Sequence, residues 1–146
     1  MSDNSSVESY EEFASRVKLE QVLTDSCSAE RMSAEASHGA EIRLEVAIAH
    51  AENSIFYRLE AQARLKSDSG KDVGRVEVSV VTRYDIGDGV IPREDVLQEF
   101  ADREAVTVAF PYAREGIQSL AARIGFAGVL IPFLGSTSEL ESLLPE

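Results

Sequence analysis

Three stretches of the chain, residues 41–48, 55–65 and 76–86, alternate between apolar and polar side chains. In the first, Ile42, Leu44 and Val46 alternate with Glu41, Arg43 and Glu45. Successive side chains of a strand point to opposite faces, so each stretch predicts a strand with one buried face. Short polar turns separate them, which favours antiparallel pairing. Residues 15–32 alternate less regularly and predict a fourth strand, with Val17, Leu19 and Leu23 on one side and a β-bulge near Val22.

The hydrophobic period changes after residue 91. Residues 92–104 predict a helix that begins at Pro92 and carries an apolar stripe. Residues 105–110 predict an extended linker, and Pro111 is expected to open a second helix that ends before Gly125, the expected C′ residue. Strands followed by helices predict an α+β fold, a four-stranded antiparallel sheet followed by helices packed on one face.

The length of 146 residues predicts one domain. We expect an acidic N-terminal tail at residues 1–14, a single α+β domain at 15–135, and a short C-terminal helical turn or tail at 136–146. The formal charge is −12, and residues 1–13 and 136–146 contain acids but no bases. A negative field disfavours nucleic acid and anionic lipid and attracts basic partners, including basic stretches of unfolded chains.

The sequence offers little chemistry. Cys27 is the only cysteine, which excludes an internal disulfide and a multi-cysteine metal site. His38 and His50 have no second ligand at metal-binding spacing, and no glycine-rich phosphate loop is present. We therefore expect no cofactor, no metal and no enzymatic activity. The polar N-terminus and the absence of a long apolar run predict a cytoplasmic protein without membrane insertion.

The segment from Ile124 to Gly135 has no charged or hydrogen-bonding side chain and contains Pro132. One interpretation is a buried connection. The other is a plastic apolar surface that accepts varied partners. The two differ in outcome: on an exposed surface Phe126→Asp leaves the fold in place, whereas in a core it unfolds the protein.

The sequence FPYARE at Phe110–Glu115, followed by a helix, a glycine and an apolar segment with proline, resembles the SecB family of protein-export chaperones. The six residues match the family pattern in full. Further matches, with Ile124 taken as an insertion, are Arg123, Gly125, Phe126, Leu130 and Pro132. The four predicted strands also fit, so the resemblance covers about residues 15–135.

The resemblance implies an ATP-independent holdase that forms a homotetramer, a dimer of dimers, and binds unfolded or precursor polypeptides in apolar grooves. By position, the client-binding candidates are Tyr112, Ile117, Leu120, Phe126, Val129, Leu130, Ile131 and Phe133. Burial of apolar client side chains, at about 25 cal/mol per Å², would drive such binding without nucleotide.

Export members of the family dock the SecA motor through acids on the outer sheet face, where Asp25 and Glu77 fall here. Arg75 and Gln21 depart from the pattern, and the C-terminal segment is short, which puts delivery to SecA in doubt. Other SecB-like proteins serve a dedicated client, the antitoxin of a toxin–antitoxin system, and the sequence does not choose between these clients.

A different class of function needs polar groups on the inward sheet face. A small α+β ligand-binding protein or enzyme, with a cavity between sheet and helices, would have only Tyr57, Thr82 and Tyr84 available there. A structural or adaptor role is the third interpretation.

Overall fold

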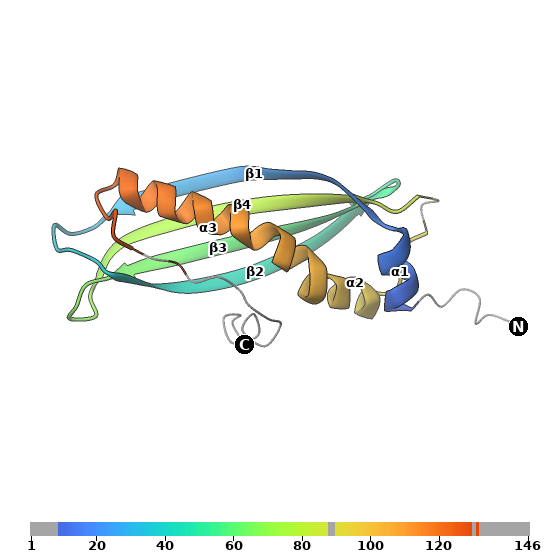
Figure 1. Ribbon diagram of the computed structural model, residues 1–146, viewed down its shortest axis with the longest axis horizontal. Coiled ribbons are helices and arrows are strands. Elements are labelled where there is room, and N and C mark those ends of the chain that lie inside the picture. Colours follow the sequence, from blue (N-terminus) through green and yellow to red (C-terminus); the bar gives the residue numbers. More distant parts are fainter. Residues whose placement is uncertain (1–8, 88–89, 130, 132–146) are drawn as a thin grey trace, which may run out of the picture.

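A computed structural model describes residues 9–87, 90–129 and 131. Its four strands are β1 (Lys18–Arg31), β2 (Gly39–Ala51), β3 (Ser54–Lys66) and β4 (Asp72–Asp85). They form one antiparallel sheet in the order β1-β4-β3-β2, with helices along one face (Figure 1). The predicted α+β architecture is confirmed.

Strand β1 departs from the predicted side-chain pattern. Its pairing with β4 shifts between Leu19 and Gln21 and again between Thr24 and Ser26. Leu19 lies opposite the inward Tyr84, but Leu23 lies opposite Val81 on the outer face. An inserted residue moves the following side chains to the other face, so the prediction that Leu19 and Leu23 share a side is wrong.

The helices form one continuous run, α2 (Glu94–Phe100), a π-helical segment η2 (Ala101–Ala105) and α3 (Val106–Arg123). The prediction of an extended linker at residues 105–110 is wrong, and Pro111 lies inside α3 instead of opening it. Val106, Ala109 and Phe110 are buried against the sheet. Packing of this apolar face overrides the strand propensity of the segment.

Small residues let the helical run approach the sheet closely. Alanine recurs at positions 101, 105, 109, 113 and 121, all fully or almost fully buried. Gly116 adjoins Val78 of β4, where an added Cβ would come within 3.3 Å of a valine methyl group. These small side chains keep α3 close to the sheet. The helix crosses the sheet diagonally, from the end near β2 toward β1 (Figure 1).

The N-terminal residues 9–14 are not a tail in the structure. Ser9 caps α1 (Tyr10–Arg16), its hydroxyl accepts from the Glu12 amide at 3.1 Å, and the Glu12 carboxylate accepts from the Ser9 amide at 2.9 Å. This capping box matches the S-x-x-E spacing, a signal that the sequence interpretation missed. Phe13 is fully buried, so α1 is part of the folded body.

The core consists of two clusters on the same sheet face. The larger one joins α3 to the long middle of the sheet. The smaller one, at the end where α1 meets α2, is rich in aromatic rings. None of the helices in the described part of the chain is long and apolar enough to cross a membrane.

Candidate functional site

The C-terminus of α3 is closed by a glycine. Gly125 has φ +98°, its amide donates to Ala122 O at 3.0 Å, and the Phe126 amide donates to Ala121 O at 2.8 Å. This is the Schellman arrangement, and the prediction of Gly125 as the C′ residue is confirmed. It turns the chain sharply, so that the next residues run back across the sheet beside α3.

Two arginines hold this returning segment, which we call the strap and define as Phe126–Val129 with Ile131. At its start, Arg31 of β1 donates to Ile124 O at 2.7 Å and its guanidinium lies 4.4 Å from the centre of the Phe126 ring. At its end, Arg114 of α3 donates from Nε to Ile131 O at 2.6 Å. Because Ile124 is the C-cap of α3, the Arg31 cation also complements the negative end of that helix's dipole.

The apolar side chains of the strap are buried. Phe126 and Val129 are each 3% exposed and Ile131 is 1% exposed, and the Phe126 ring lies on Gly74 of β4. The interpretation of these side chains as a solvent-facing surface is wrong for the isolated chain, because they fill the space between α3 and the sheet. Leu130 and Phe133 lie outside the described residues.

The remaining candidates lie on α3 itself. Ile117 is fully buried beneath the helix and is a core residue. Tyr112 is 52% exposed, and Leu120 is partly buried at the margin of the core. Among the predicted residues that the structure describes, Tyr112 and Leu120 are therefore reachable, and Ile117, Phe126, Val129 and Ile131 are buried.

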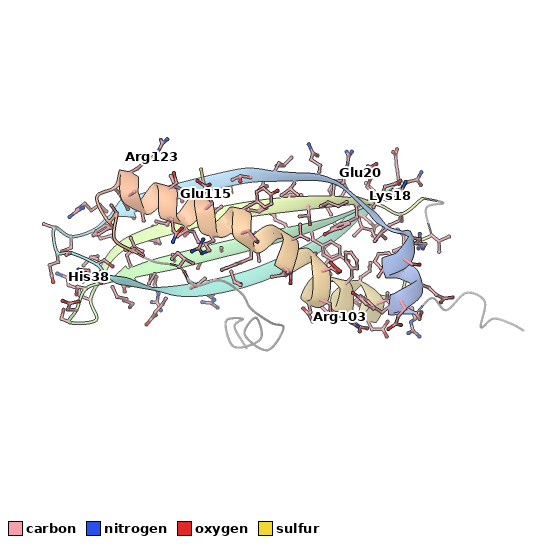
Figure 2. The ribbon with its side chains drawn as sticks, in the orientation of Figure 1. Lys18, Glu20, His38, Arg103, Glu115 and Arg123 are labelled. Atoms are coloured by element: carbon pink, nitrogen blue, oxygen red, sulfur yellow. The ribbon has the colours of Figure 1, made fainter. Side chains whose placement is uncertain are left out.

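A hollow of about 290 Å³ opens on the side of α3 that faces β1. Figure 2 shows Glu115 and Arg123 along this side of the helix, facing β1. The hollow exists because β1 is poorly covered: α3 crosses above β4 and leaves Thr24 and Cys27 exposed. Its lining residues are Thr24, Cys27, Val78, Glu115, Gly116, Ser119, Leu120 and Arg123.

This hollow and the two strap arginines were not found by sequence reasoning. Arg31 ends a strand and Arg114 belongs to an ordinary helical pattern, and nothing local to either residue indicates a bond to a carbonyl far along the chain. The nearest sequence signal is Gly125, which marks the turn that these arginines hold. In the structure, a Cβ added at this position would collide with the Arg31 guanidinium.

The two proposed docking acids lie among arginines on the opposite, outer face. Asp25 lies 3.4 Å from Arg58, and Glu77 lies 3.8 Å from Arg75. Arg75 also bonds Glu30 at 3.0 Å. This face carries pairs of opposite charge in place of a free acidic platform, and such exposed pairs contribute little to stability.

The inward polar groups that a ligand cavity would need are buried in the aromatic cluster. The Tyr57 hydroxyl donates to Leu97 O at 3.0 Å, and Thr82 donates to Tyr57 O at 3.4 Å. Burial raises the pKa of Tyr84 to about 12 and also raises the pKa of Tyr57. These groups serve the packing of the sheet end.

Metal and nucleophile chemistry finds no support in the described residues. No group of histidine, cysteine and acidic side chains there could hold a metal ion. His38 is exposed and lies 3.3 Å from Asp68, and Cys27 is an exposed free thiol.

The fold and this surface define a class, α+β proteins whose four-stranded antiparallel sheet carries one long helix and a returning apolar segment on the same face. That architecture is the SecB-like chaperone fold. One solved structure superposes on this chain with a TM-score of 0.74 and 16% sequence identity. The match covers 84% of this chain and 94% of the chain in the solved structure. It is the Mycobacterium tuberculosis Rv1957 SecB-like chaperone in complex with a ChAD peptide from the Rv1956 HigA1 antitoxin. No protein-family model and no curated protein sequence matches this chain.

Proposed function

We propose that this chain is an ATP-independent holdase chaperone of the cytoplasm that binds non-native polypeptides and has no enzymatic activity. The observation that carries the proposal is the SecB-like fold together with the hollow between α3 and β1. The similar structure is a chaperone that holds an antitoxin peptide, which supports a polypeptide as ligand. The exposed, single thiol of Cys27 suits a reducing compartment.

The reachable part of the client site is the β1 side of α3. Leu120 lines the hollow there, and Tyr112 of α3 and Leu19 of β1 are further exposed apolar side chains, at 52% and 46% exposure. Ile117, Phe126, Val129 and Ile131 form the layer beneath. They contact a client only where the strap moves. Leu130 and Phe133 complete the candidate set and lie outside the described residues.

A dedicated client such as an antitoxin is the favoured partner over a general export substrate. Asp25 and Glu77 would have to exchange their arginine partners for a basic SecA surface, which costs part of the attraction. Export through SecA remains the second possibility, and a pull-down from the native host separates the two.

We also propose a homotetramer, a dimer of dimers. Strand β1 is an edge of the sheet, and natural proteins rarely leave such an edge open. On α3, Thr107, Pro111 and Ala122 are exposed and uncharged and do not line the hollow. Light scattering after gel filtration tests the assembly, and a monomer at micromolar concentration contradicts it.

The chaperone function is tested by aggregation of a reduced, unfolded model protein without ATP. We expect suppression near one chain per client. Tyr112→Asp should weaken client binding about tenfold, equivalent to about 1.4 kcal/mol, because it replaces an exposed aromatic ring of α3 with a charge. Ser28→Asp adds the same charge on the exposed outer face of β1 and should change nothing.

Two results would contradict these expectations for aggregation suppression. If the folded protein fails to suppress aggregation at any ratio, the holdase proposal is refuted. If suppression occurs but both aspartate variants behave alike, the client site lies elsewhere on the molecule.

A further inference from the structure

The hollow between α3 and β1 carries two exposed charges on its helical wall. Glu115, Ser119 and Arg123 follow one another at intervals of four along α3, so their side chains lie on one side of the helix. Figure 2 shows Glu115 and Arg123 along this side, facing β1. A rise of about 1.5 Å per residue places the two charged positions about 12 Å apart along the helix axis. The hollow therefore has an anion toward one end and a cation toward the other.

Neither charge has a partner within the residues that the structure describes. The side chains of Glu115 and Arg123 form no hydrogen bond or ion pair there. They are too far apart along the helix to pair with each other, and Ser119, which lies between them, is uncharged. Both charges are therefore available to a ligand in the hollow.

The strand wall of the hollow supplies no counter-charge. Thr24 and Cys27 of β1 line it, and both are uncharged. The acids of this part of the strand are used elsewhere, since Asp25 and Glu30 pair with arginines of the outer sheet face. A charge that matches Glu115 or Arg123 must therefore come from the ligand.

The lining between the two charges is apolar and narrow. Val78 of β4 and Leu120 of α3 contribute side chains to it, and Gly116 leaves space because it has none. The volume of about 290 Å³ suits a few side chains of one segment. An apolar side chain flanked by a cation and an anion would complement this arrangement, because it buries apolar area and pairs both charges.

The distance between the charges selects an extended segment. Each residue of a strand advances the chain by about 3.3 Å, and residues at even spacing point to the same side. Side chains four positions apart are therefore about 13 Å apart and share a side, which matches the separation along α3. The residue midway between them points the same way and reaches Leu120.

We propose that Glu115 and Arg123 determine which client segments the hollow accepts. The preferred segment is extended and carries a basic and an acidic residue four positions apart, with an apolar residue midway. Its basic side chain lies at Glu115 and its acidic side chain at Arg123. The inference rests on the proposed chaperone function for the class of ligand and adds the pattern that distinguishes one client from another. An antiparallel second copy of α3 is the competing occupant, because it would also bring these opposite charges together.

The first test compares two fluorescent peptides on the full chain by fluorescence anisotropy. Both are nine residues long, consist of serine and threonine apart from three residues, and have lysine third and leucine fifth. Glutamate is the seventh residue of one and the sixth of the other, where it points to the opposite side of an extended chain. Since exposed ion pairs are weak, we expect the first peptide to bind about fivefold more tightly. Equal binding of the two peptides overturns the proposal.

Charge reversal in the protein gives the second test. Glu115→Lys makes both ends of the hollow basic, so this variant should prefer a peptide with glutamate at both the third and seventh positions. Arg123→Glu should prefer the peptide with lysine at both. Glu45→Lys is the matched control, because it makes the same change at an exposed acid of β2 outside the hollow, and it should keep the original preference. If the two α3 variants also keep that preference, the proposal is overturned.

Light scattering after gel filtration on the same variants separates a client from a second copy. If each single reversal at Glu115 or Arg123 dissociates the assembly, the double reversal restores it, and peptide preference does not change, the charges pair between copies and the proposal is overturned. Aggregation suppression without a preference for the charge pattern refutes this inference alone. Pattern-selective peptide binding without suppression refutes the chaperone function and supports the peptide site.

Discussion

Replacement of Phe126 by alanine tests whether the strap is core or client surface. The ring is 3% exposed, lies on Gly74 and contacts the guanidinium of Arg31. Removal of a buried phenylalanine costs about 3 to 5 kcal/mol in well-packed cores. The site lies at the end of the sheet beside the exposed Arg31, where partial collapse is possible, so we expect about 3 kcal/mol.

The contribution of Arg31 can be measured separately. Arg31→Ala removes the bond to Ile124 O and the contact with the ring, and because this arginine is exposed we expect about 1 kcal/mol. The two single variants and the double variant form a cycle. A coupling free energy of about 0.5 to 1 kcal/mol between the two substitutions would measure the contribution of the ring–guanidinium contact to stability.

The assay is urea unfolding at fixed protein concentration, with the midpoint and slope compared between variants. Tyr112→Ala is the matched control, since it removes an aromatic ring that is 52% exposed and should cost about 0.5 kcal/mol or less. If Phe126→Ala costs under about 1 kcal/mol and lowers client binding instead, the strap is a displaced or exposed surface and the reasoning from burial is wrong.

Three further outcomes are expected. Gly125→Ala should destabilise by about 1 to 2 kcal/mol, measured by urea unfolding, because φ is +98° and the new Cβ meets Arg31. Ser9→Ala should cost about 1 kcal/mol and speed hydrogen exchange in α1 without changing that of β3. Because burial raises the folded pKa of Tyr84 to about 12, its stabilisation is complete below pH 10 and declines as the pH rises toward 12. Between pH 10 and pH 12, the Tm of Tyr84→Phe should therefore fall less steeply with pH than the Tm of the unaltered protein. Identical slopes of Tm against pH in the two proteins would contradict this.

Local sequence pattern was a good guide where one face of a strand is buried. The alternation in residues 41–86 predicted three strands because each inward position packs on the core. The same logic failed for β1, an edge strand with little cover, where two shifts in pairing moved Leu23 to the outer face. A shift of this kind depends on the partner strand and leaves no mark in the alternation itself.

Helical positions show a similar limit. Gly125 predicted the end of α3 because the positive φ of a C′ glycine is a local preference of the backbone. The valines and phenylalanine before Pro111 were predicted to form an extended linker, because their helical conformation depends on packing against the sheet that they cover. Burial of Phe13 and Phe126 likewise requires partners from β4 and α2, which are distant in sequence.

The sequence by itself determined the four strands, the helical region that follows them, and the glycine that turns the chain back after α3. These features follow from periodicity and from local backbone preference, which act over a few residues. The tertiary structure alone decided that the apolar strap is buried, that Arg31 and Arg114 hold it, and that a hollow opens between α3 and β1. Burial is a property of surfaces brought together from distant parts of the chain, so it becomes defined only when the helix lies across the sheet.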